Sequence, residues 1–129
     1  MSFVSDIEDF HTKYELKYTG PPRVLPKDVR SFRQKFIDEE LIEYGMAPTL
    51  ADEFDALIDM VYVILGTAHM QGLDFQAGWD IVHEANMKKV RGPSERSELD
   101  VIKPDGWVAP DLTDLCATNQ ISFEWTKEE

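Results

Sequence analysis

The sequence predicts an all-α protein, a bundle of four main helices that is completed by oligomerisation and followed by an irregular C-terminal arm. Apolar residues recur at helical spacing through about the first 90 residues, and Gly, Pro or a capping residue bounds each periodic run. Beyond that point the helical period is lost and Gly and Pro recur. The 129 residues are expected to form one domain over 1–129, with a helical core at about 5–90 and a lid and tail at about 91–129.

Local signals predict where the helices begin. Ser5 followed by Glu8 fits a capping box at the start of the first helix, and Pro26 begins the second. Thr49 and Asp74 are the expected N-caps of the third and fourth helices. The four expected helices cover about residues 5–17, 26–44, 49–71 and 75–90.

The composition argues against several classes of partner. With 13 Lys and Arg against 25 Asp and Glu, the net charge is −12, so the chain lacks the broad basic face that binds a nucleic acid polymer. The apolar stretch Met60–Ala68 is too short to cross a bilayer, and the N-terminus lacks the pattern of a secretory signal. The single cysteine, Cys116, has no partner for an internal disulfide. We therefore expect a cytoplasmic protein without a membrane partner.

Carboxylates continue the apolar stripe of the second helix. Helical spacing places Glu40 and Glu43 on the face that begins as core, with Glu39 at its edge. The stripe consists of Val29, Phe32 and Phe36.

The third helix repeats this pattern. Asp55 and Asp59 precede the small or apolar residues Val63, Gly66 and Met70 on one face. A short loop between two antiparallel helices would bring the end of the second helix beside the start of the third. The expected carboxylate cluster consists of Glu39, Glu40, Glu43, Asp55 and Asp59.

Such a cluster, when partly buried, needs a counter-cation because like charges repel and buried ions are costly. Oxygen ligands without Cys select Mg²⁺, Mn²⁺ or Ca²⁺. The alternative is that these side chains form a solvated helix surface, which the position of both runs on core stripes disfavours.

The end of the fourth helix carries a different chemistry. Asn86 and Lys89 continue its apolar stripe, and His83 lies a turn earlier on the flank. An amide and a cation suit a phosphate ester and the edge of a base or sugar. The alternative is a helix C-terminus whose Lys88, Lys89 and Arg91 oppose the helix dipole.

Four segments in this order resemble the all-α nucleoside triphosphate pyrophosphohydrolases. The resemblance is to the MazG-like branch of bacterial or phage type, which is related to the dimeric dUTPases and to phosphoribosyl-ATP pyrophosphohydrolase. The segments are Glu39–Glu43 (EELIE, the EExxE motif), Asp55–Asp59 (DALID), Val82–Lys89 (VHEANMKK, similar to HxxNMxK) and Lys103–Leu112 (KPDGWVAPDL).

The resemblance implies hydrolysis of a nucleoside triphosphate, expected to be a deoxynucleotide, at the α–β phosphoanhydride, which would control or clean the nucleotide pool. It also implies Mg²⁺ as cofactor, with Mn²⁺ able to substitute, and a homodimer or homotetramer in the cytoplasm (of a host cell, if phage-encoded). Glu39 or Glu40 would orient the attacking water. The implied metal ligands are Glu40, Glu43, Asp55 and Asp59, and the implied substrate-binding residues are His83, Asn86, Lys89, Arg91, Lys103 and Trp107.

One position departs from the family pattern. The second acidic motif is usually ExxD, but Ala56 stands three residues before Asp59. Asp55 could take that role because positions i and i+4 share a helix face, and Asp52 or Glu53 are the other candidates.

The sequence leaves open two alternative functions of the chain and the role of one residue, Trp107. The chain could be a non-catalytic acidic helical bundle that binds a partner protein, helped by an exposed arm around Phe123 and Trp125. Asp80 and His83 have the i, i+3 spacing of di-iron carboxylate bundles, but this pair occurs once. Trp107 could stack on a base or anchor its loop by packing.

Overall fold

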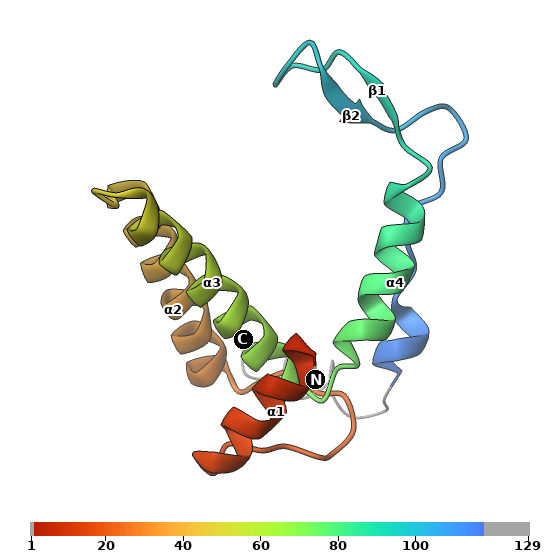
Figure 1. Ribbon diagram of the computed structural model, residues 1–129. Coiled ribbons are helices and arrows are strands. Elements are labelled where there is room, and N and C mark those ends of the chain that lie inside the picture. The colour runs from red at the N-terminus through yellow and green to blue at the C-terminus, as the bar shows by residue number, and fades with distance from the viewer. Residues whose placement is uncertain (1, 118–129) are drawn as a thin grey trace.

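The computed structural model describes residues 2–117 of the chain, and these form an open, mostly helical structure. Two antiparallel helices, α2 and α3, make one arm, and α4 makes a second arm that diverges from it (Figure 1). The first helix, α1, lies across the base of the arms. In chain order the elements are α1 (Phe3–Lys13), α2 (Lys27–Met46), α3 (Leu50–Met70), α4 (Phe75–Asn86), β1 (Val90–Gly92), β2 (Asp100–Ile102) and a 3₁₀-helix, η1 (Thr113–Cys116).

Side-chain caps account for most of the helix starts. The expected caps of α3 and α4 are confirmed, since Thr49 Oγ1 accepts from the N–H of Asp52 and Asp74 accepts from the N–H of Ala77. The expected cap of α1 is wrong. Ser2 is the N-cap, and Ser5 completes a capping box with it one turn earlier than Ser5 and Glu8 would. The helix also ends earlier, at residue 13 instead of about 17.

A sharp turn separates α3 from α4 and opens the molecule. Gly72 lies in the left-handed region with φ 67°, where a side chain would be strained, and it ends α3. The axes of α3 and α4 then bend by 116° at this turn. Within the described residues no single helix is long and apolar enough to cross a membrane, and only this bent pair passes a test of length and composition.

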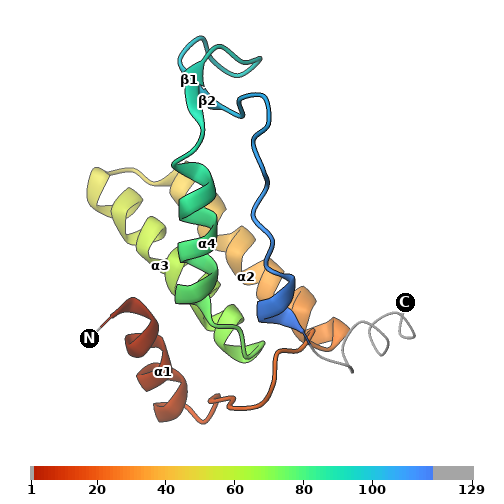
Figure 2. The same cartoon turned by 90° about the vertical axis from the view of Figure 1, so that its right-hand side faces the viewer.

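The region after α4 is more ordered than the loss of helical period indicated. Helix α4 ends at Asn86, four residues before the expected boundary at about residue 90, because β1 begins at Val90 and pairs antiparallel with β2. The chain then runs back alongside α4 to η1 (Figure 2). The arm expected around Phe123 and Trp125 lies outside the described residues.

A buried arginine, and not an aromatic stripe, joins α2 to α3. Arg33 is 9% exposed and donates hydrogen bonds to Val63 O and Thr67 Oγ1, both at 3.0 Å. Gly66 makes this possible, since a Cβ there would stand 2.9 Å from the Arg33 guanidinium. The inward face of α2 is therefore centred on Arg33, and the predicted inward position of Phe32 is wrong, with 61% of that residue exposed.

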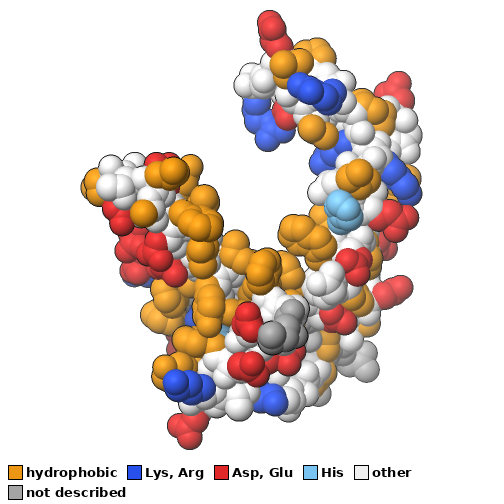
Figure 3. All heavy atoms as spheres, viewed as in Figure 1, with side chains coloured by type: hydrophobic (Ala, Val, Ile, Leu, Met, Phe, Trp, Pro, Cys, Tyr) orange, Lys and Arg blue, Asp and Glu red, His pale blue; other side chains and the backbone are white. Residues whose placement is uncertain are grey.

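The buried core of one chain is small for so many large apolar residues. Hydrophobic side chains gather over the side of α3 that faces α4 (Figure 3). Val61, Ile64 and Trp79 remain 47%, 39% and 60% exposed. The buried apolar residues are Ile7, Leu25, Ala56, Val63, Leu65, Ala68 and Ala85.

Candidate active site

Four carboxylates come within electrostatic reach of one another between the C-terminal half of α2 and the N-terminal half of α3. The short connection between these helices reverses the chain, so the acidic positions of the two helices come together. The charges of Glu43, Asp59 and Asp55 each raise the pKa of Glu40, which identifies the four as one electrostatic group. We call Glu40, Glu43, Asp55 and Asp59 the carboxylate cluster.

Glu40 is the buried member of the cluster. Its residue is 8% exposed, and its Oε2 is buried without a hydrogen-bond partner among the described residues. Burial, a hydrogen bond between the Glu40 and Glu43 carboxyl groups, and the neighbouring negative charges together raise the pKa of Glu40 to about 7. A carboxylate in this position repels its neighbours unless a proton or a cation neutralises it.

The α3 side of the cluster is built by Asp55 and Asp59. Asp59 is half-buried, and burial together with the charges of Asp55 and Glu43 raises its pKa. Asp55 is four residues earlier and therefore shares its helix face.

Asp52 and Glu53, the other candidates for the acidic position that Ala56 occupies in the family motif, lie outside the carboxylate cluster. Asp52 accepts the hydroxyl of Thr49 at the helix N-terminus, at 2.8 Å, and Glu53 borders an apolar hollow beside Leu50. Ala56 is only 2% exposed, so it is part of the core. Of the three candidates, only Asp55 is among the charged groups that raise the pKa of Glu40.

Glu39 stands outside the cluster. It is exposed, and it is not among the charged groups that raise the pKa of Glu40. One residue along a helix corresponds to a rotation of about 100°, which turns Glu39 away from the face that Glu40 occupies.

Carboxylate oxygens are chemically suited to a hard divalent cation, but the described side chains are not positioned to surround one. Among residues 2–117 no group of three or more His, Cys, Asp or Glu is arranged so that it could hold a metal ion. The buried, unpartnered Glu40 Oε2 is nevertheless the kind of oxygen that a cation would satisfy. Mg²⁺ suits such an open set because it is usually bound by one or two carboxylates and keeps several waters.

The predicted substrate-binding residues lie on the other arm. His83 and Asn86 are exposed near the C-terminal end of α4, and the remaining ones follow that helix. No cation from this arm forms an ion pair with the carboxylate cluster within the described residues. One chain therefore brings the acidic residues together but keeps them apart from the predicted cations (Figure 1).

Trp107 has a packing role that the sequence left open. Its indole Nε1–H donates to Ala85 O at 2.7 Å, which attaches the loop after β2 to α4. The Nζ atoms of Lys89 and Lys103 lie 5.3 and 5.2 Å from the centre of its ring. Arg91, the remaining residue of the predicted set, lies in β1 opposite Val101.

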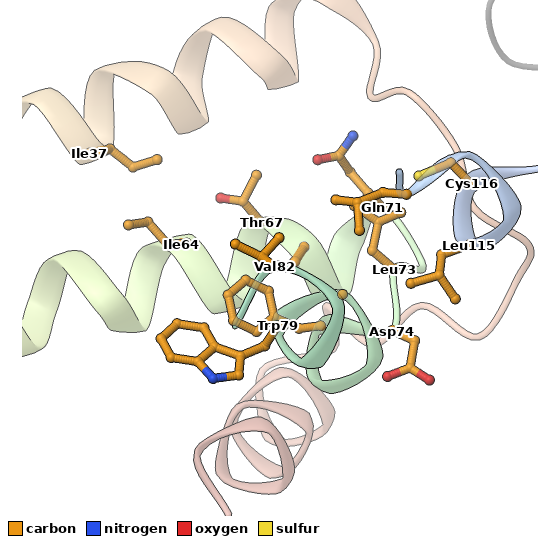
Figure 4. Close-up of a pocket in the computed structure, with 14 residues that line it drawn as sticks. Ile37, Ile64, Thr67, Gln71, Leu73, Asp74, Trp79, Val82, Leu115 and Cys116 are labelled. Carbon is orange, nitrogen blue, oxygen red and sulfur yellow. The ribbon is translucent and has the colours of Figure 1, made fainter. Parts of the chain in front are cut away.

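An apolar cleft of about 490 Å³ lies between the arms, toward the turn that joins α3 to α4. Ile37 and Ile64 line one side and Trp79 the other, with η1 at one end (Figure 4). Ile37 precedes Glu40 by three residues, so the cleft begins about one helical turn from the cluster. The periodic apolar positions of α3 and α4 were the only signal for it.

The polar groups that line this cleft already have partners. Thr67 Oγ1 accepts from Arg33 and donates to Val63 O, and Gln71 Nε2 donates to Arg23 O. The cleft therefore offers mainly apolar surface.

The all-α fold, with carboxylates gathered from two antiparallel helices, accords with the superfamily of all-α nucleoside triphosphate pyrophosphohydrolases, to which a family match assigns the chain. The chain belongs to the phosphoribosyl-ATP pyrophosphohydrolase family, whose sequence profile matches residues 7–86, or 80 of the 129 residues. It is accordingly a pyrophosphohydrolase that acts on a nucleotide phosphoanhydride. No curated protein matches the chain. The matched range contains the whole carboxylate cluster and excludes β1, β2 and Trp107.

Proposed function

We propose that the protein hydrolyses a nucleoside triphosphate, most readily a deoxynucleotide, at the α–β phosphoanhydride. The products are a nucleoside monophosphate and pyrophosphate, so the activity would control or clean the nucleotide pool. The observation that carries the proposal is the buried, unpartnered Glu40 Oε2 among three further carboxylates. Such an arrangement is costly for folding alone and useful for binding a cation.

Mg²⁺ is the proposed cofactor, and Mn²⁺ is expected to substitute. A nucleoside triphosphate carries about four negative charges and the protein has a net charge of −12. Because the two repel one another, a bound cation is needed to hold the triphosphate at the carboxylates. Bound Mg²⁺ would neutralise phosphate charge and polarise the reacting phosphoryl group. The residues proposed to hold it are Glu40, Glu43, Asp55 and Asp59.

The cluster also supplies a proton acceptor. Glu40 is the better placed of the two candidates for orienting the attacking water, because Glu39 is exposed and stands outside the cluster. The water oxygen bonds to one of the two phosphorus atoms as the bond from that atom to the bridging oxygen breaks, the water proton passes to Glu40, and nucleoside monophosphate and pyrophosphate are released. His83 and Asn86 would contact the sugar or phosphates once the second arm approaches the cluster.

Two substrate classes share this chemistry. The family name points to phosphoribosyl-ATP, whereas the segment Val82–Lys89 resembles the HxxNMxK segment of enzymes that act on free nucleotides. This resemblance is our reason to favour a nucleoside triphosphate.

A product analysis tests the proposal. The protein is incubated with each common NTP and dNTP and with phosphoribosyl-ATP, in Mg²⁺, Mn²⁺ or chelator, and the products are resolved by ion exchange. We expect monophosphate and pyrophosphate from one or a few dNTPs, and no turnover in chelator. Turnover of phosphoribosyl-ATP alone would contradict the substrate assignment, and turnover in chelator would contradict the metal requirement.

A second candidate function is supported by the end of the α2–α3 arm. Met46, Leu50 and Phe54 are 78%, 79% and 62% exposed there, which suits a protein-binding surface. A thermal shift experiment with Mg²⁺ and a non-hydrolysable dNTP separates the two functions. The enzyme should be stabilised by the combination, whereas a pure docking module should not respond.

A further inference from the structure

Two lysines stand opposite one another at the base of the β1–β2 hairpin. The register pairs Val90 with Ile102, so the next positions outward are Lys89 and Lys103. The hairpin therefore brings both lysines to the same end of the ladder.

Trp107 holds these two side chains. Both Nζ atoms lie within 5.3 Å of the centre of its ring, a distance at which a cation is attracted to the electron-rich face of an indole. The ring itself is fixed by the hydrogen bond from its Nε1–H to Ala85 O on α4. The backbone N–H of Trp107 donates to Pro104 O at 3.0 Å and closes the turn that carries the ring.

The two lysines lack a carboxylate partner, unlike their neighbours. Lys88 is 3.5 Å from Glu84, and Arg96 is 2.8 Å from Asp100. Neither Lys89 nor Lys103 forms an ion pair anywhere in residues 2–117. In a chain of net charge −12, two adjacent cations without a counter-ion are a local site for an anion.

The hollow on the α4 side of Trp107 is not the place for that anion. Its volume is about 500 Å³, but Glu84 and Asp105 contribute to its wall, and neither Lys89 nor Lys103 lines it. The anion would instead bind at the lysine ammonium groups, where no acidic side chain forms an ion pair.

We propose that Trp107 is a positioning residue that holds Lys89 and Lys103 together as one site for the polyphosphate end of the substrate. The inference rests on the proposed function, since a nucleoside triphosphate is the multivalent anion in question. It assigns a role to residues that lie outside the range matched by the family profile. Of the two roles that the sequence left open for Trp107, it favours the packing anchor over stacking on a base, because the indole N–H and ring are already engaged.

Binding of inorganic tripolyphosphate to the full chain, measured by calorimetry without divalent cations, tests the site apart from the carboxylate cluster. We expect Trp107→Leu to weaken binding about tenfold, because it removes both ring contacts and the hydrogen bond. Trp107→Phe, which keeps a ring, should restore part of the affinity. Lys89→Met and Lys103→Met should each weaken binding, and the matched control Lys88→Met should not.

Steady-state kinetics supply the second readout. In Trp107→Leu we expect KM for the best nucleotide to rise by about the same factor as the dissociation constant, while kcat stays within about twofold. Circular dichroism checks the fold of each variant, and Trp107→Phe carries the test if Trp107→Leu fails to fold.

The outcomes separate this inference from the proposed function. Undetectable binding of tripolyphosphate to the wild-type chain overturns the inference, as does equal binding by wild type, Trp107→Leu and Trp107→Phe. Either result can occur while the protein still hydrolyses nucleotides. Conversely, loss of binding in Trp107→Leu with recovery in Trp107→Phe supports the site even if no tested nucleotide is turned over.

Discussion

Glu40 occupies a position where a carboxylate is hard to accommodate. It follows Arg33 by seven residues, or two helical turns, and so lies on the buried face of α2. The guanidinium of Arg33 is engaged by α3, and no cation forms an ion pair with Glu40 within the described residues. Burial and the neighbouring negative charges disfavour the ionised form of Glu40, so its charge lowers the stability of the metal-free protein.

Replacing Glu40 with Gln should separate function from stability. The substitution Glu40→Gln keeps the shape and removes the charge, so we expect turnover to fall at least about a hundredfold. The free energy of unfolding of the metal-free variant at pH 8 should equal or exceed that of wild type. Denaturant unfolding and a turnover assay measure both quantities.

The matched control is Asp38→Asn, which removes a charge from an exposed position on the same helix. It should leave turnover and stability close to wild type. A destabilised Glu40→Gln protein, or one with wild-type turnover, would contradict the role assigned to the buried carboxylate.

The raised pKa of Glu40 predicts how stability depends on pH without metal. The folded protein binds this proton more tightly than the unfolded chain, whose pKa is near the ordinary value of 4.5. The contribution of the protonated group is therefore complete below about pH 4.5 and is lost as pH rises through about 7. Urea unfolding at pH 5 and pH 8 should show this decrease, and Glu40→Gln should flatten it. If the free energy of unfolding changed equally with pH in wild type and Glu40→Gln, Glu40 would be excluded as the source of the pH dependence.

At the scale of elements, the first three turns of α3 decide which acidic residues reach the cluster. Asp52 is used at the helix N-terminus by Thr49, whereas Asp55 and Asp59 share the face toward α2. The helix period thus separates a capping carboxylate from two site carboxylates.

Asp55 is expected to supply the carboxylate that the usual motif has at position 56. Asp55→Asn should raise the Mg²⁺ concentration needed for half-maximal turnover about tenfold or more, because it removes a charge from the cluster. The control is Glu53→Gln, which changes a side chain near Leu50 instead. Titration of Mg²⁺ in the turnover assay checks both. A larger effect in Glu53→Gln would move the role to that residue.

At the scale of the whole molecule, the two arms leave apolar surface exposed between them. Val61 and Ile64 on α3 face a hollow of about 660 Å³ that Trp79 also lines. Exposed apolar area of this kind marks a protein interface more often than a stable monomer surface. The predicted cations and the carboxylate cluster are also on different arms of one chain.

We predict that two or four copies assemble through this surface, so that the α4 arm of one copy approaches the carboxylate cluster of another. Light scattering coupled to size exclusion should give at least twice the mass of the chain. Ile64→Glu should dissociate the oligomer and reduce turnover, whereas Leu99→Glu, at a 72% exposed hairpin position, should do neither. A fully active monomer would rule out the shared site.

Local chemistry is what the sequence by itself determined. Capping at Thr49 and Asp74 depends on hydrogen bonds across three residues, and both caps are where the sequence predicted them. The same short range placed Asp55 and Asp59 on one helix face. The family resemblance rested on four segments in order along the chain, of which EELIE and DALID supply the acidic residues.

The tertiary structure alone decided which of these residues are buried and what they meet. Arg33 faces inward in place of Phe32 because Gly66 and two oxygen acceptors on α3 are opposite it, some thirty residues along the chain. The turn at Gly72 directs α4 away from the carboxylate cluster. Strand pairing brings Lys89 to Lys103 and both to one indole. Helix period and capping act over one or two turns, whereas burial and electrostatic environment depend on segments that only folding brings together.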